Sequence, residues 1–262
     1  MQGKRAGERN EGEGVGGAEV GSITRAVRIL TALGASDIPL GVSELARRTG
    51  ISKSSAYRVA AELCDNGLLE RDGTRYVLAL RLFELGQRVP RQRDLREAAR
   101  PFMSDLREAT GHTSHLAVLD GESVVYLEVV RSPNAPPLPT RTGSRWPAHA
   151  TGIGKAILAY SPADVVDRVL VAGLPRLSER TMTTPGRLIA ELARIRERGI
   201  AYDLEESMPG VACAAGTVFG ADGQVVAGLS VSGWHNRINL ELSAAAVRTA
   251  TLGLTRRLAD HR

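Results

Sequence analysis

The sequence predicts an α+β protein that has a winged helix-turn-helix at its start and a separate mixed domain after it. Between residues 42 and 77, two short helical patterns are separated by a tight turn and followed by a two-strand ribbon. From residue 111 onward, strand-like runs joined by hairpin turns alternate with helical patterns. Apolar residues make up 43% of the 262 residues, which is enough for a packed core in each part.

The first 20 residues are not predicted to fold. They are rich in Gly, Glu and Arg and carry almost no apolar side chains, so we expect a disordered tail. Four glutamates outnumber the cations Lys4, Arg5 and Arg9, which favours a solvated tail over an arm that binds DNA. Ser22 is the expected N-cap of a first helix. The apolar face of that helix is expected to consist of Ile23, Ala26, Val27, Leu30 and Leu33.

The helix-turn-helix follows. Ser43 is the expected N-cap of its first helix, and Gly50 ends that helix because the turn requires a residue that tolerates a positive φ. Ser52 is the expected N-cap of the second helix. The inward face of the second helix carries four apolar residues at helical spacing, namely Ala56, Val59, Ala60 and Leu63.

The outward face of the second helix suits the major groove of DNA. Its small hydroxyls permit close approach, Arg58 can reach a phosphate or a guanine edge, and the free N–H groups of the first turn favour phosphate. Asp72-Gly73 predicts a hairpin between strands at 68–71 and 75–78, which form the wing. The residues expected to contact double-stranded DNA are Ser52, Lys53, Ser54, Ser55, Tyr57 and Arg58 on the helix, and Arg71 and Arg75 on the wing.

Two other interpretations share this pattern: an ordinary helical hairpin with a solvated polar face, and a winged helix that binds another protein. The wing and the cap spacing together favour DNA. The net charge of +5 and the pI of about 9.6 suit a nucleic-acid partner without requiring one.

A connector links the two parts. Residues 80–88 have a short helical pattern that Pro90 interrupts, and residues 91–109 have a longer one in which Pro101 implies a kink or a join of two pieces. We interpret the arginine-rich connector as a solvated linker. The expected division is a tail at 1–20, a DNA-binding domain at 21–80, a linker helix at 81–98 and a second domain at 99–262.

The sequence pattern of the second domain predicts strands interleaved with helices, which is an α+β arrangement. Ser161 is the expected N-cap of one helix, with Pro162 as its first residue. The other expected helices lie at 152–160, 185–198 and 240–259. The expected strands lie at 115–119, 124–130, 200–204, 211–218 and 225–232, and residues 132–139 are a Pro-rich loop.

Composition also indicates the compartment. The two cysteines, Cys64 and Cys213, provide no disulfide framework, which is typical of a reducing cytoplasm. The sequence has neither an apolar run long enough for a membrane span nor the apolar core of a signal peptide. The five histidines are scattered without metal-ligand spacing, so we expect neither a metal site nor a cofactor.

Seven motifs in fixed order resemble those of IclR-type transcriptional regulators, and together they extend over about residues 22–260. They are Ser22–Leu30, Gly50–Arg58, Ala99–Met103, Pro147–Ala159, Arg194–Asp203, Pro209–Ala215 and Gly228–Gly233. The resemblance implies a C-terminal GAF-like effector domain and a homodimer, often assembled further into a dimer of dimers. It implies a regulator, a repressor rather than an activator, of a metabolic operon that senses a small organic acid or aromatic metabolite. The effector residues that it implies are Ala150, Thr151, Gly152, Asp203, Cys213, Ser230 and Ser232.

The sequence departs from the family pattern at a few positions, which bear on the ligand and not on the class. Ser55 stands where threonine is usual, Gly216 and Thr217 follow the Cys213 strand, and Trp146 precedes the effector loop. A competing interpretation is an enzyme in which Cys213 pairs with His149 or His115 as base. The sequence contains no local nucleophile motif, and Gly152–Lys155 lacks the spacing of a nucleotide-binding loop.

Overall fold

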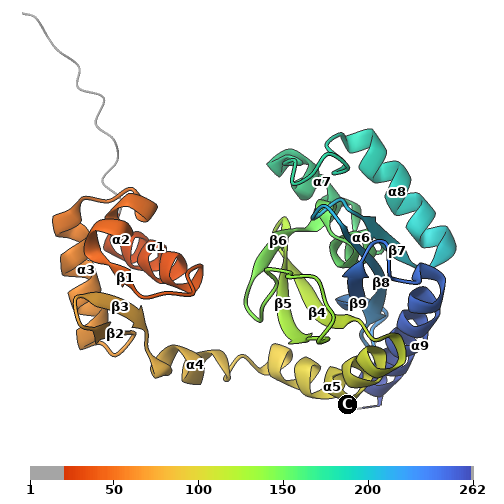
Figure 1. Cartoon of the computed structure of the whole chain (residues 1–262), viewed down its shortest axis with the longest axis horizontal. Coiled ribbons are helices and arrows are strands. Elements are labelled where there is room, and N and C mark those ends of the chain that lie inside the picture. The colour runs from red at the N-terminus through yellow and green to blue at the C-terminus, as the bar shows by residue number, and fades with distance from the viewer. Residues whose placement is uncertain (1–20, 261–262) are drawn as a thin grey trace, which may run out of the picture. The chain divides into compact units, whose positions relative to one another are not determined.

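The computed structural model describes residues 21–260, and the expected tail at 1–20, with Lys4, Arg5 and Arg9, lies outside the described residues. The chain divides into two compact units between Gln87 and Arg88, here called the N-terminal and C-terminal units (Figure 1). A helix-turn-helix unit followed by an α+β unit confirms the expected fold class. Among the described residues, no helix combines the length and the apolar character needed to cross a bilayer.

The N-terminal unit is a three-helix bundle with a small wing. Its elements are α1 (Ser22–Gly34), β1 (Leu40–Gly41), α2 (Val42–Thr49), α3 (Lys53–Asp65), β2 (Leu69–Asp72), β3 (Arg75–Leu78) and α4 (Leu80–Gly86). The strands form an antiparallel sheet in the order β1-β3-β2. The two-residue strand β1 was not predicted, because so short a segment has no periodicity. The core consists of Ile29, Leu33, Leu40, Leu45, Val59, Ala60, Leu63, Leu69 and Tyr76.

The turn signals of this unit are confirmed. Gly50 is left-handed at φ 69°, and Gly73 in the wing hairpin has φ 60°. The Ser52 hydroxyl accepts a hydrogen bond from the Ser55 N–H at 3.2 Å and so caps α3. These signals fix the position of α3 after the turn.

Three other predicted caps are wrong, by one residue at Ser22 and Ser161 and by two residues at Ser43. Gly21 and Gly41 occupy the cap positions of α1 and α2, so Ser22 and Ser43 lie inside the helices. Helix α7 (Ala163–Ala172) has Pro162 as its N-cap, and the Ser161 hydroxyl instead donates to the Ile157 carbonyl at 2.9 Å. A serine side chain does not by itself decide at which residue the backbone leaves the extended region.

The predicted inner face of α1 is also partly wrong. Ile23 and Val27 are 80% and 53% exposed, whereas Ile29, which was not predicted, is fully buried beside Leu33. The contacts that α1 makes with α2 and α3 turn the Ile29 and Leu33 side of the helix inward. Ile23 and Val27 therefore form an exposed apolar pair one turn apart.

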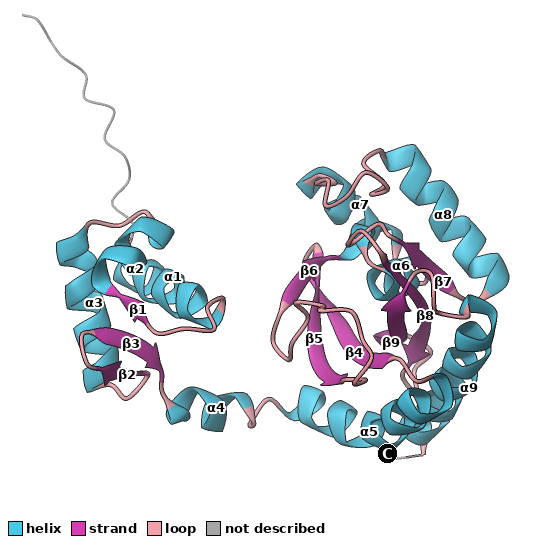
Figure 2. Cartoon of the chain, viewed as in Figure 1, coloured by secondary structure: helices cyan, strands magenta, loops and turns pink. Residues whose placement is uncertain are grey.

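The C-terminal unit is a six-stranded antiparallel sheet between two layers of helices (Figure 2). The strand order is β6-β5-β4-β9-β8-β7. Its elements are α5 (Pro90–Thr110), β4 (Thr113–Asp120), β5 (Ser123–Val130), β6 (Arg145–Pro147), the 3-10 helix η1 (Ala148–Ala150), α6 (Gly152–Ala159), α7, α8 (Pro185–Arg198), β7 (Ala201–Leu204), β8 (Val211–Phe219), β9 (Val225–Trp234) and α9 (Leu240–Ala259). The five predicted strands are confirmed, whereas β6 was not predicted.

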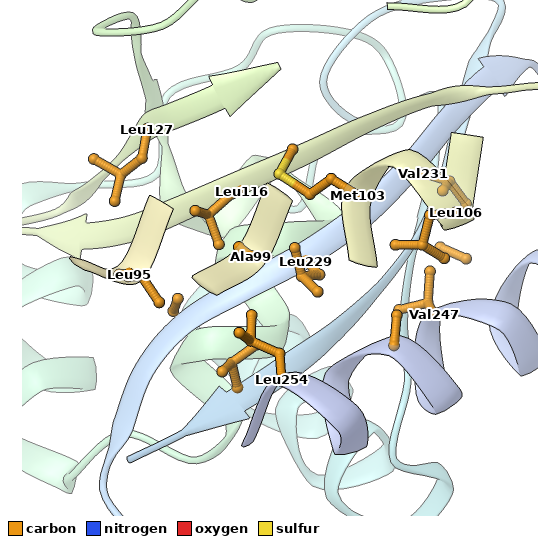
Figure 3. Close-up of a cluster of buried hydrophobic side chains, with 14 of the residues drawn as sticks. Leu95, Ala99, Met103, Leu106, Leu116, Leu127, Leu229, Val231, Val247 and Leu254 are labelled. Carbon is orange, nitrogen blue, oxygen red and sulfur yellow. The ribbon is translucent and has the colours of Figure 1, made fainter. Parts of the chain in front are cut away.

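Helices α5 and α9 cover one face of this sheet. Figure 3 shows the core between these two helices and the sheet, where side chains of α5 and α9 meet those of the central strands. The labelled members are Leu95, Ala99, Met103, Leu106, Leu116, Leu127, Leu229, Val231, Val247 and Leu254. The opposite face packs mainly against α6 and α8.

Helix α5 runs without interruption from Pro90 to Thr110, so a join of two pieces at Pro101 is wrong. Pro101 is exposed, while Ala99 and Met103 on either side of it are fully buried against the sheet. This packing offsets the hydrogen bond that an internal proline removes. The boundary expected between residues 98 and 99 falls inside this helix.

Candidate functional site

The outer face of α3 is polar and open to solvent. Ser52, Lys53, Ser54, Tyr57 and Arg58 are all exposed, as predicted from helical spacing. Ser55 differs, because only 9% of it is exposed and its hydroxyl accepts a hydrogen bond from the Arg25 guanidinium at 3.3 Å. Ser55 was expected on the flank of this face as a DNA contact, but it lies on the inner side of the first turn.

The two wing arginines touch other parts of the N-terminal unit. The guanidinium carbon of Arg71 lies 5.9 Å from the centre of the Tyr57 ring and 5.7 Å from that of Tyr76. Arg71 thus links the outer face of α3 to the wing through cation–π contacts. Arg75 donates to the Pro39 carbonyl at 3.2 Å and remains exposed.

The C-terminal unit has a small cavity on the sheet face that α6 covers. Asp203 lies opposite Cys213, and Cys213 lies opposite Ser232, so the three side chains share one face. Ser230, two residues from Ser232, shares that face and lies opposite His115. The cavity measures about 20 Å³, roughly the room of one water molecule. Its walls are His115, Tyr126, Leu138, Thr140, Trp146, Thr151, Gly152, Ile153, Asp203, Ser207, Val211, Cys213, Ser230 and Ser232.

One wall of the cavity is the start of α6. The Thr151 hydroxyl caps this helix by accepting from the Gly154 N–H at 3.1 Å. Gly152 and Ile153, the first two helical residues, line the cavity. The N–H groups of a first turn have no carbonyl one turn earlier and favour a negative group. Across the cavity, the hydroxyls of Ser230 and Ser232 add neutral donors.

A buried charge cluster supports this wall from behind. The ammonium of Lys155, which is fully buried, forms an ion pair with the carboxylate of Glu206. Asp203 accepts hydrogen bonds from the Glu206 N–H at 2.7 Å and the Ser207 hydroxyl at 2.5 Å. Burial raises the pKa of both carboxyls, and the nearby Lys155 charge works against this rise. The cluster fixes the loop after β7 against α6.

The geometry provides no activated thiol. Burial raises the pKa of the Cys213 thiol to about 12, and the Asp203 charge adds to the rise. His115 and Cys213 lie on β4 and β8, which are separated by β9, so the Cα atoms are roughly 10 Å apart at the usual strand spacing. The Nε2 of His149 lies 3.1 Å from the Pro175 carbonyl oxygen. Within residues 21–260, then, neither histidine activates Cys213.

Six of the seven effector residues expected from the resemblance line this one cavity; the exception is Ala150, which is buried in η1 but is not part of the wall. Four polar wall residues were not expected to contact the effector, namely His115, Tyr126, Thr140 and Ser207, and His115 was considered only as a base for Cys213. Their position depends on the order of the strands and on the path of two loops, for which a single sequence has no local signal. Among the described groups of histidine, cysteine and carboxylate residues, none is arranged to hold a metal ion.

The structure gives a physical reason for three of the positions at which the sequence departs from the family pattern. Gly216 lies under α9, where a Cβ atom would come within 3.0 Å of the Thr251 side chain. The Thr217 hydroxyl donates to the Ala156 carbonyl of α6 at 2.7 Å. Trp146 forms part of the cavity wall, so its large ring takes space there.

Comparison with known proteins extends over both units. A family model described as the IclR helix-turn-helix domain matches residues 22–73, and one described as the bacterial transcriptional regulator IclR C-terminal domain matches residues 87–253. The HTH-type transcriptional regulator KdgR of Escherichia coli is 37% identical over 216 residues, which cover 81% of this chain and 82% of that protein. The transcriptional repressor IclR of Escherichia coli is 27% identical and covers 88% of each chain.

A solved structure is similar along almost its whole length. It is an IclR homologue from Microbacterium hydrocarbonoxydans in complex with 4-hydroxybenzoate, with a TM-score of 0.82 and 28% identity. The match covers 91% of this chain and 99% of the other.

Proposed function

Because the chain belongs to the IclR family of transcriptional regulators, we propose that it represses a metabolic operon and responds to a small organic acid or aromatic metabolite. The observation that carries the proposal is the cavity beside the first turn of α6, on the same chain as an exposed reading helix. In this proposal residues 21–80 bind promoter DNA in the cytoplasm and residues 99–262 sense the ligand. Residues 81–98 form the linker that connects these two domains.

The DNA contacts are assigned to the exposed residues of α3 and to the wing. Arg58 has the reach to contact a base edge, while Lys53 and the hydroxyls of Ser52 and Ser54 suit phosphates at the start of the helix. Arg71 orients Tyr57, and Arg75 extends from the wing. Ser55 is no longer proposed as a contact, because it is buried.

A homodimer fits the exposed apolar surface of the N-terminal unit. Ile23 and Val27 on α1 are exposed, and so are Leu80, Phe83 and Leu85 on α4, a helix that has no buried residue. Large apolar side chains that are exposed near one another along a helix, as on α1 and again on α4, mark interaction surfaces. A two-fold dimer would read a pseudo-palindromic operator, with one α3 helix in each of two successive major grooves.

Replacing Arg58 with alanine tests the DNA-binding part. We expect operator affinity to fall by about 1–3 kcal/mol, roughly 5- to 150-fold, because a charged contact to base or phosphate is lost. A mobility-shift titration at fixed salt on the upstream region of the chain's own gene measures the change. The matched control is Arg168→Ala, which removes the same charge from exposed α7 and should leave affinity unchanged. Equal affinity of all three proteins would remove Arg58 from the interface.

The ligand-binding part rests on the chemistry of the cavity. An acid group would lie between the first turn of α6 and the hydroxyls of Ser230 and Ser232. A carboxylic acid of even a few heavy atoms exceeds 20 Å³, so binding requires the cavity to widen. A ligand that binds only the widened form shifts the balance between two conformations, which is what a switch requires.

Replacing Gly152 with alanine tests the cavity. The new Cβ would lie 3.1 Å from the Cys213 sulfur and 3.3 Å from the Asp203 nitrogen, so it would take up space in the wall. We expect the affinity for the best acid found in a thermal-shift screen to fall about tenfold or more, with operator binding intact in the absence of ligand. Calorimetry measures the affinity. An unchanged affinity would place the acid elsewhere.

A further inference from the structure

His115 is a cavity residue that the acid-binding wall does not use. It lies on β4 opposite Ser230, and its side chain shares the cavity face with Ser230 and Ser232. The Nε2 atom is 3.1 Å from the Thr140 hydroxyl, and the ring packs edge-on against Tyr126 with centroids 5.3 Å apart. These contacts hold the imidazole in one orientation.

The second ring nitrogen of His115 is unusual. The residue is only 2% exposed, and its Nδ1 atom has no hydrogen-bond partner among residues 21–260. A buried polar atom without a partner costs stability, so such atoms are rare in folded proteins. Burial, assisted by the nearby Arg131 charge, lowers the pKa of His115 to about 3, so the ring is neutral. A neutral imidazole offers one donor and one acceptor.

We propose that His115 reads a hydroxyl group of the effector through Nδ1, so that the protein prefers hydroxylated organic acids to the same acids without the hydroxyl. This inference rests on the proposed ligand-sensing function and names the class of ligand. If Nε2–H donates to Thr140, then Nδ1 accepts; if Thr140 donates, then Nδ1–H donates. A hydroxyl can pair with either form, whereas a carbonyl, which only accepts, or an ammonium group, which only donates, can pair with only one.

The arrangement of the cavity supports two separate ligand groups. Gly152 is the first residue of α6, and Ser232 lies on β9 opposite Cys213 of β8, whereas His115 lies on β4, on the far side of β9 from β8. Thr140 and Leu138 belong to the Pro-rich loop at 132–139 and the residues just after it, which form the wall beside His115. A ligand with an acid at one end and a hydroxyl at the other would meet both sets of groups.

Matched pairs of acids test the inference with the full-length protein. The pairs are lactate with propionate, 4-hydroxybutyrate with butyrate, and 4-hydroxybenzoate with benzoate. In calorimetric titrations we expect one hydroxylated member to bind about tenfold more tightly than its partner, the factor that one net hydrogen bond provides. We expect His115→Gln to abolish this preference, because its amide replaces only the Nε2 position.

The matched variant is His115→Asn, whose amide can take the Nδ1 position and should restore part of the preference. Because His115 is buried, a second measurement avoids reliance on variants that fold poorly. In ¹H–¹⁵N spectra of the histidine rings of the unaltered protein, the His115 Nδ1 signal should move with the hydroxylated acid and stay in place with its partner. Equal affinity within every pair, or a preference that survives in His115→Gln, would overturn the inference and leave the proposed function standing. Failure of all six acids to bind would overturn the inference together with the acid-sensing part of that function, while operator binding would still be tested separately.

Discussion

Replacing Gly154 with alanine is expected to destabilise the C-terminal unit by about 3 kcal/mol or more. A Cβ atom at this position would lie 2.2 Å from the carbonyl oxygen of Ala148 and 2.5 Å from its Cα atom. Both are backbone atoms of the buried helix η1, which precedes α6, so no side chain can rotate away. Relief of the clash must move η1 or the start of α6, which carries the cavity wall.

Tryptophan fluorescence during urea unfolding measures this loss. The chain has two tryptophans, Trp146 and Trp234, and both belong to the C-terminal unit, so their signal reports on that unit. The control is Gly186→Ala in α8, where a Cβ would meet nothing within 4 Å. Alanine there should be neutral or stabilise by up to about 1 kcal/mol, because alanine favours helix. A Gly154→Ala protein as stable as this control would contradict the close approach of η1 and α6.

Replacing Lys155 with methionine is expected to cost about 3–5 kcal/mol, because it leaves the buried Glu206 carboxylate without its cation. One carboxylate oxygen of Glu206 already lacks a hydrogen-bond partner among the described residues, so nothing else there compensates the charge. Burial has raised the pKa of Glu206, and removal of Lys155 raises it further. A carboxyl whose folded pKa lies above its unfolded value destabilises the fold as pH rises between the two, so the loss should be larger near pH 8 than near pH 5.

The double variant Lys155→Met with Glu206→Leu distinguishes an uncompensated charge from lost packing. Removal of both charges should recover at least about 2 kcal/mol relative to Lys155→Met, as followed by the same fluorescence. A double variant less stable than the single one would show that packing of the lysine chain, and not the charge of Glu206, accounts for the loss.

Gly154 and Lys155 are adjacent in α6, and both support the structure around the same cavity. Gly154 permits η1 to pack against the helix. Through Glu206, Lys155 anchors the loop after β7, in which Ser207 donates a hydrogen bond to Asp203 of that strand. Either substitution should therefore weaken ligand binding along with stability, although neither side chain belongs to the cavity wall. Stability and sensing share one structural element in this protein.

Local chemistry made much of the fold predictable. Gly50, Ser52 and Asp72-Gly73 specify their turns through their own backbone preferences and side-chain caps, so the helix-turn-helix and the wing were correctly located. The exact residue of a helix cap was harder to predict, and the caps expected at Ser22, Ser43 and Ser161 were wrong by one or two residues. The two shortest strands, β1 and β6, depend on pairing with a distant strand and leave no pattern in the sequence.

The effector residues were predictable only in part. Ser230 and Ser232 share a face because of strand periodicity, and the family resemblance implied their partners Asp203 and Cys213. The position of His115 opposite Ser230 depends on β4 lying beside β9, which are more than 100 residues apart in sequence. Thr140 reaches the same cavity through an irregular loop, for which periodicity predicts nothing.

The sequence by itself determined the class of regulator, the two kinds of domain and the outward face of α3, because helix period, turn residues and ordered motifs act over short distances along the chain. Only the tertiary structure decided that Ser55 turns inward, that Ile23 and Val27 remain exposed, and that Lys155 pairs with Glu206. It also decided that His115 completes the cavity. These outcomes depend on which distant segments pack together, and that choice is made by the summed burial of the whole unit and not by any local run of residues.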